Sequence, residues 1–169
     1  MTSERAKKSP VAAQSLKLFR LLGSTAAGRW TFTRLICFKA PYFASISPLI
    51  DDLAPGRCVV VLRDRRRVRN HIGTVHAIAM CNAAELAGGL ATDVSIAPNQ
   101  RWIPKGMSVR YLRKAKGTLT ATALVAVPPA DAPAQEAHTF VEVRDAANEL
   151  VFDADIAMWI SPRHADQNA

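Results

Sequence analysis

The sequence predicts an α+β fold in which an antiparallel sheet wraps around one long central helix, with extra helices at the N-terminus. The segment from Thr74 to Thr92 has the length of a helix and carries a single charge, Glu85, which is typical of a helix buried on all sides. Short runs in which apolar and polar residues alternate follow it, as in strands with one buried face. An apolar helix followed by such strands favours a sheet that covers the helix.

The chain divides into three parts: an N-terminal helical extension over residues 1–52, a main domain over residues 53–163 and a tail over residues 164–169. Apolar residues between 14 and 50 predict two or three short helices, with breaks at Pro41 and Pro48 because proline interrupts a helix. This extension is either a packing layer on the main domain or an element of aromatic and basic residues that lies on a membrane surface or closes over a site.

The other elements follow from local patterns. Cys58–Leu62 is short and rich in β-branched residues, so it predicts a strand after the turn at Pro55-Gly56. Thr74 is the predicted N-cap of the long helix, since its hydroxyl can accept a hydrogen bond from the first turn. The second half predicts four strands, over residues 107–111, 118–127, 139–144 and 150–160, with a turn at Gly117 and a loop over 128–137.

Composition and charge narrow the function classes. Lysine and arginine outnumber acidic residues by 22 to 14, a net charge of +8, which favours a polyanionic partner such as nucleic acid, an anionic membrane or the phosphates of coenzyme A. No stretch approaches the roughly 20 apolar residues of a transmembrane helix. The cysteines form no CxxC pair and no zinc spacing, so we expect reduced thiols, no metal and a cytoplasmic protein. No motif indicates a cofactor.

The candidate chemical segment is Asn70-x-x-Gly73-x-x-His76, with Glu85 nine residues further along. A carboxylate inside an apolar helix must be paired or have a raised pKa, and a raised pKa makes it a better general base near neutral pH. Each residue also has a simpler interpretation. Glu85 can be a structural carboxylate paired with an arginine or with Asn82. His76 can be a helix-start residue satisfied by backbone, and Asn70 can be a turn residue.

The order of elements and this motif resemble the hotdog-fold thioesterases, especially the phenylacetate-pathway type of acyl-CoA thioesterase. The segments RNHIGTVHAIAMCNAAELAGGL and MSVRYLRKAKGTLTATA are similar to a hotdog family of uncharacterised bacterial proteins with a domain of unknown function. The resemblance covers about residues 53–162. It implies an acyl-CoA or other acyl thioester as substrate, hydrolysed by carboxylate-activated water. It also implies a homodimer, or a tetramer made of two such dimers.

The resemblance implies roles for single residues. Asn70 and His76 would line the thioester site, and Glu85 would activate water or attack the carbonyl. A backbone N–H of Ala77 or Ile78 would polarise the thioester oxygen, since helix N-termini stabilise negative charge. Active members of the family have two glycines where this chain has Ala77 and Ile78, and an Ile side chain narrows or blocks the pocket. A non-catalytic hotdog protein that binds an acyl chain or acyl-CoA is therefore the alternative.

Arginines supply the predicted contacts to the phosphates of coenzyme A, because a guanidinium binds phosphate in a bidentate manner. The predicted substrate-binding residues are Arg66, Arg67, Arg113 and Gly73. A solvated basic face is the simpler interpretation. Nucleic-acid binding is not predicted, since aromatic residues do not alternate with these arginines and no nucleic-acid motif occurs.

Helix geometry bears on the assembly. Glu85 lies roughly 12 Å along the helix axis from Ala77 at 1.5 Å per residue. One helix therefore cannot supply both the oxyanion donor and the base, whereas two antiparallel helices of a homodimer can. Gly88 and Gly89 of the same helix predict close packing against the sheet or against a partner helix.

Overall fold

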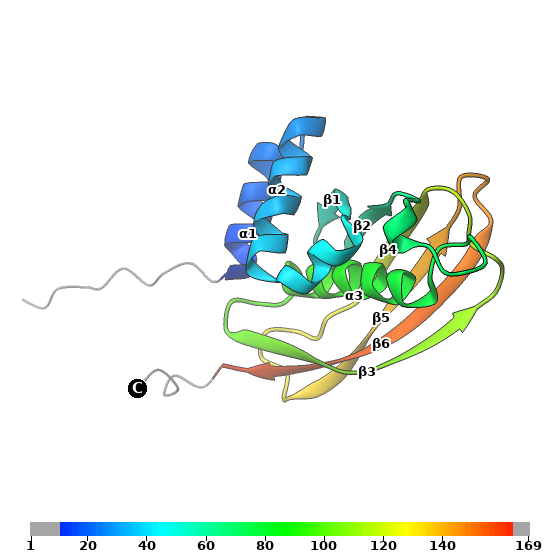
Figure 1. The fold of residues 1–169 in the computed structure, drawn as a ribbon. Helices are drawn as coiled ribbons and strands as arrows, with labels where there is room; N and C mark the ends of the chain where they lie inside the picture. The colour runs from blue at the N-terminus through cyan, green and yellow to red at the C-terminus, as the bar shows by residue number, and fades with distance from the viewer. Residues whose placement is uncertain (1–10, 164–169) are drawn as a thin grey trace, which may run out of the picture.

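The structure is a computed structural model that describes residues 11–163. Six antiparallel strands form one sheet in the order β1-β2-β4-β5-β6-β3, and helix α3 lies across its inner face (Figure 1). The predicted α+β architecture is confirmed; the predicted tail over residues 164–169 lies outside the described residues. The helices are α1 (Val11–Leu22), α2 (Ala26–Lys39) and α3 (Ala77–Asp93), with 3-10 turns η1 (Pro41–Ile46) and η2 (Arg66–Val68). The strands are β1 (Leu49–Ala54), β2 (Arg57–Leu62), β3 (Gln100–Tyr111), β4 (Leu119–Val125), β5 (Gln135–Arg144) and β6 (Leu150–Pro162).

Helix α3 approaches the sheet closely because its buried positions carry small residues. Seven of them are alanine or glycine: Ala79, Ala83, Ala84, Ala87, Gly88, Gly89 and Ala91. A Cβ added to Gly88 would lie 2.9 Å from Cδ1 of Ile156 in β6. A Cβ added to Gly89 would lie 3.0 Å from Cη2 of Trp102 in β3. The predicted close packing of these two glycines is confirmed, and their neighbour is the sheet.

Strand β6 pairs with both β5 and β3, and its alternation separates two environments. One set of residues is buried in the core: Phe152, Ala154, Ile156, Met158 and Ile160. On the other face, Asp153 accepts two hydrogen bonds from the Arg110 guanidinium of β3, at 2.8 and 2.6 Å. The strand predicted over residues 150–160 is confirmed, with its apolar face toward the helix.

Strand β1 contradicts the expectation of helices up to residue 50. Its buried residues, Ile50 and Leu53, are three positions apart, because the register against β2 shifts between Ile50 and Asp52. A bulge changes the face to which the following residues point, so the period of two is hidden in the sequence. Helices α1 and α2 confirm the rest of the helical prediction. The domain boundary at residue 52 stays a prediction.

Two further strands begin earlier than predicted. Strand β3 starts at Gln100 instead of residue 107, and β5 starts at Gln135, inside the predicted loop. Pro104 lacks an N–H and Gly106 has a low strand propensity, so together they conceal the first half of β3. The structure accommodates them at a shift of register against β6, between Pro104 and Gly106.

The N-terminal helices pack along the β1 end of the sheet (Figure 1). Phe19 of α1 meets Phe32 of α2 edge to face, with ring centroids 5.1 Å apart. The Ile50 N–H of β1 donates to Thr33 Oγ1 of α2 at 2.9 Å in a buried position. These contacts agree with the interpretation of the extension as a packing layer. Within residues 11–163, no helix is long and apolar enough to cross a membrane.

Replacing Gly88 with valine is expected to lower the free energy of unfolding by about 1–3 kcal/mol, because the added side chain overpacks the contact with Ile156. Gly106→Val is the matched control, since a Cβ there meets nothing within 4 Å. Its expected effect is within about 0.5 kcal/mol. Urea unfolding of both variants measures the difference. Equal stabilities would contradict the close approach of α3 to the sheet.

Candidate functional site

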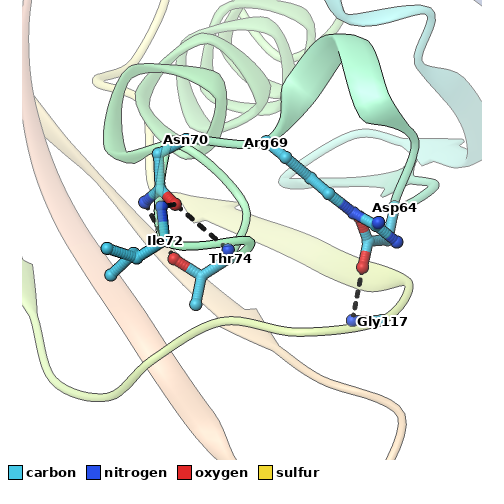
Figure 2. A network of polar contacts seen from close by, with 6 residues as sticks. All are labelled: Asp64, Arg69, Asn70, Ile72, Thr74 and Gly117. Carbon is cyan, nitrogen blue, oxygen red and sulfur yellow. Dashed lines mark hydrogen bonds and ion pairs between the residues drawn. The ribbon is translucent and has the colours of Figure 1, made fainter.

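Asn70 organises a tight turn just before α3. Its Oδ1 accepts hydrogen bonds from the N–H groups of Ile72 (3.2 Å) and Thr74 (3.1 Å), and its Nδ2 donates to Thr74 Oγ1 at 2.8 Å (Figure 2). Gly73 takes a φ of +77° in this turn, a conformation that glycine adopts without strain. These bonds support the interpretation of Asn70 as a turn residue. A part in catalysis stays a prediction for Asn70, and a substrate contact stays one for the exposed Gly73.

A second polar network holds the chain on the other side of this turn. Asp64 accepts a hydrogen bond from Arg69 Nε at 2.7 Å and another from the Gly117 N–H at 3.0 Å (Figure 2). The hydrogen bond from Arg69 is the main reason why the pKa of Asp64 lies below its usual range. The network ties the arginine-rich segment after β2 to the connection between β3 and β4. These hydrogen bonds therefore hold in place the segment that leads into α3.

The N-cap of α3 is His76, which corrects the prediction of Thr74. The Thr74 side chain is occupied by Asn70 in the turn, whereas His76 Nδ1 accepts a hydrogen bond from the Ile78 N–H at 3.1 Å. For Nδ1 to accept, the neutral ring carries its proton on Nε2. Of the two predicted oxyanion donors, the Ile78 N–H is thus already used. Within residues 11–163, no group accepts a hydrogen bond from the Ala77 N–H.

A groove of about 410 Å³ borders the start of α3 on the side of β3. It brings together three residues of the sequence prediction, namely Asn70, Ala77 and Arg113. Arg113 Nη1 also contacts Glu149 Oε2 at 3.2 Å. Met80 and Tyr111, which the sequence does not predict as site residues, also line the groove. The position of Tyr111 at a strand end, two residues before Arg113, is the signal that could have identified it.

Tyr111 contacts Cys81, the one half-buried cysteine of the described chain. Its hydroxyl lies 3.2 Å from Cys81 Sγ, one turn along α3 from Ala77. This hydrogen bond, followed by burial, raises the pKa of Tyr111 to about 12. The phenol therefore keeps its proton at neutral pH and remains a hydrogen-bond donor beside the groove.

A separate cavity of about 200 Å³ borders the helix start on the side of η1. His76, Ile78 and Arg67 line it, together with Asn82. Asn82 Nδ2 donates to Ser45 Oγ at 3.2 Å, so this residue does not pair with Glu85. Asn82 Oδ1 is buried and has no hydrogen-bond partner within residues 11–163. The predicted contacts His76 and Arg67 are thus together, but across the helix from the groove.

Glu85 departs from the prediction most clearly. It is exposed in the chain, although its neighbours Ala84 and Leu86 are buried. The expectation of a buried carboxylate at this position is therefore wrong. Glu85 borders a small apolar cavity of about 150 Å³ between α2, η1 and α3, more than two turns from the helix start. A single chain does not bring Glu85 to the Ala77 N–H, and the predicted Arg66 lies exposed on η2.

Burial raises the pKa of Asp93, the last residue of α3, at the far end of the same cavity. It accepts a hydrogen bond from Trp102 Nε1 at 3.2 Å, which lowers the pKa but does not outweigh burial. Asp93 lies one residue beyond the apolar segment that predicts the helix. In the part of the chain that the structure describes, no group of three or more His, Cys, Asp or Glu could hold a metal ion.

Comparisons with known proteins agree with this architecture. Residues 28–160 match the family described as Domain of unknown function (DUF4442). The crystal structure of the genomics protein APC5556 is similar, with 41% sequence identity and a TM-score of 0.77 over 90% of this chain and 99% of that one. No curated protein matches the chain.

Two more distant structures share the fold. Thioesterase HI1161 from Haemophilus influenzae is 14% identical, with a TM-score of 0.69 over 82% of this chain and 94% of that one. A thioesterase family protein from Silicibacter pomeroyi is 17% identical, with a TM-score of 0.66 over 77% and 96%. The predicted hotdog fold is confirmed by this likeness.

Asp93→Asn is expected to stabilise the protein at neutral pH. A carboxyl whose folded pKa is raised favours the protonated folded state, so wild-type stability falls as pH rises from the ordinary value of 3.8 through the folded pKa. Asparagine keeps an acceptor for Trp102 and carries no charge. The difference in free energy of unfolding between the variant and the wild type should therefore vanish well below pH 3.8, where Asp93 is protonated in both the folded and the unfolded state. Urea unfolding across this range measures it. Asp131→Asn, in an exposed loop, is the matched control and should show no such trend.

Proposed function

The chain belongs to the DUF4442 family, and on that premise we propose that it hydrolyses an acyl thioester such as an acyl-CoA as a homodimer. The observation that carries the proposal is the unused N–H of Ala77, the first residue of a 17-residue helix and one of the residues that line the groove. Helix N-termini carry a partial positive charge, and thioester hydrolysis builds negative charge on the carbonyl oxygen. A carbonyl placed in the groove would therefore be stabilised in the transition state.

The position of Glu85 supports a site shared between two copies. The residue is exposed although Ala84 and Leu86 on either side of it are buried, and it is too far from Ala77 to act within one chain. In a two-fold pair with antiparallel α3 helices, Glu85 of one copy faces the helix start of the other. This arrangement gives each site one carboxylate and one oxyanion donor.

Strand β3 supports the same assembly. Within the described chain it pairs only with β6, so its outer edge is unpaired. Three large apolar residues along it are exposed: Ile103, Met107 and Tyr111. An edge of this kind pairs readily with another copy, and the exposed residues would be covered in the process.

The reaction then needs only groups of this chain. Glu85 takes a proton from a water molecule, whose oxygen attacks the thioester carbonyl. The oxyanion is held by the Ala77 N–H until the C–S bond breaks. The leaving thiolate receives the proton that Glu85 took, and the products are a carboxylic acid and a thiol. Tyr111, Arg113 and His76 line the approach to this point from its two sides.

One observation favours a second candidate, a hotdog protein that binds an acyl chain or acyl-CoA without hydrolysis. The Ile78 N–H is taken by His76, so only one oxyanion donor is open. The Ile78 side chain is 55% exposed at the helix start, where it would narrow the space for the thioester. Thermal stabilisation by acyl-CoA without release of thiol would favour this candidate.

Ala77→Pro is expected to reduce turnover of acyl-CoA esters by about 10²–10³-fold, because it deletes the oxyanion donor. Proline is tolerated at the first position of a helix, and His76 already has the extended backbone (φ −66°, ψ 138°) that a following proline requires. The melting temperature should therefore change little. Ala77→Gly keeps the N–H, so its turnover should exceed that of Ala77→Pro. A thiol-detecting dye reports turnover, and equal rates for the two variants would exclude this donor.

Glu85→Gln is expected to lower turnover by about 10²–10⁴-fold if the residue acts as general base. Mixing it with Ala77→Pro tests the shared site directly. Random re-pairing makes half of the dimers mixed, and each mixed dimer has one intact site of two, so activity should recover to about a quarter of wild type. Recovery requires Glu85 and Ala77 to come from different copies. If subunit exchange is verified and activity still does not recover, the shared site is ruled out.

A further inference from the structure

We propose that the cavity between α2 and the segment after β2 binds a purine nucleotide phosphate, and that its ligand is the nucleotide part of a coenzyme A thioester. The cavity measures about 220 Å³. Trp30 and Arg34 of α2 line one side, and Arg63 and Arg65 line the other, with Ser47 between them. The assignment to coenzyme A rests on the proposed function, whereas nucleotide binding does not.

The charges at this cavity lack counterions. The three acidic residues of this region are each paired with another arginine: Asp51 with Arg29, Asp52 with Arg57 and Asp64 with Arg69. Within residues 11–163, Arg34, Arg63 and Arg65 form no ion pair. Guanidinium groups that converge on one cavity repel one another unless an anion lies between them. Their planar forks match the geometry of phosphate oxygens.

Trp30 makes the site suitable for a base as well as for a phosphate. Its side chain is 56% exposed, and the Arg34 guanidinium carbon lies 5.3 Å from its ring centroid. Nucleobases stack on exposed aromatic rings and on arginine planes. A site for a bare phosphate gains nothing from the indole. One aromatic residue over a small cavity fits a single nucleotide better than a strand, which needs a longer groove with several stacking rings.

One chain segment connects this cavity to the cavity at His76, on the η1 side of the start of α3. Arg67, two residues after Arg65, donates to Ser47 Oγ at 3.0 Å and lines the cavity that also holds His76. The unpartnered Asn82 Oδ1 lies at that second cavity. The arm between the nucleotide and the sulfur of coenzyme A contains amide N–H groups, which can donate to such an acceptor. A nucleotide at Trp30 would therefore direct its arm toward the start of α3.

Calorimetric titration with adenosine 3′,5′-bisphosphate tests the site without any turnover. The double variant Arg63→Gln/Arg65→Gln is expected to weaken binding by at least about tenfold, since it removes two charge-assisted contacts. Trp30→Leu should weaken binding of the bisphosphate but not of pyrophosphate. The control Arg20→Gln/Arg101→Gln makes the same change of net charge at exposed positions elsewhere and should bind like wild type.

The outcomes separate this site from the proposed hydrolysis. No saturable binding, or equal binding by both double variants, would overturn the site even if acyl thioesters are hydrolysed. ATP is the alternative nucleotide ligand. If the protein binds ATP as tightly as the bisphosphate, the assignment to coenzyme A is overturned. If hydrolysis also occurs, kcat/KM for acyl-CoA should exceed that for the matching acyl-pantetheine, and the ratio should fall in Arg63→Gln/Arg65→Gln. Nucleotide binding without hydrolysis of either ester would leave the site standing and reject the hydrolase.

Discussion

The close approach of α3 to the sheet is the constraint on which the rest of the structure depends. Gly88 and Gly89 leave room for the side chains of Ile156 and Trp102, so the backbone of the helix packs closely against the sheet. A sheet that packs this closely covers the helix completely from Leu86 to Thr92, and the exposed residues of the helix, Ile78 and Glu85, both lie before that stretch. Because the sheet already covers the inner face of α3, a ligand can contact this helix only at its N-terminal end.

Local hydrogen bonds then decide what this open end offers. The turn of Asn70 and Thr74 and the cap of His76 satisfy nearly all polar groups around the helix start, and the Asp64 network fixes the segment that precedes them. A helix of this kind has several N–H groups without internal partners. Here the cap takes the Ile78 N–H and leaves the N–H of Ala77, a residue that lines the groove, without an acceptor in the described chain. His76, which ends the irregular segment before α3, therefore leaves one backbone N–H at the helix start, that of Ala77, available to a ligand.

The sequence predicts those parts of the structure that depend on periodicity within one segment. The apolar run that forms α3 and the alternation in β6 are of this kind. Strand β1 was not predictable in this way, because the bulge after Ile50 breaks the period, and Pro104 conceals β3 for a similar reason. Glu85 was misjudged because the coverage of a helix face depends on neighbours distant in sequence. Burial raises the pKa of Asp93 at the other end of this helix, and its contact with Trp102 is likewise a tertiary effect that no local pattern contains.

Recognition and chemistry use different parts of this architecture. The arginines around Trp30, the cavity at Asn82 and the groove at Ala77 all belong to one chain, so a single copy contains every proposed contact to the substrate. The proposed base is the exception, since Glu85 is too far from the start of its own helix and would reach a helix start only in the proposed pair of copies. Binding that is equal in the ground and transition states does not accelerate a reaction, whereas the oxyanion donor and the base act chiefly in the transition state. If the proposed function holds, dissociation of the pair would therefore abolish hydrolysis while leaving affinity for the thioester largely intact. Assembly, rather than binding, would then determine whether hydrolysis occurs.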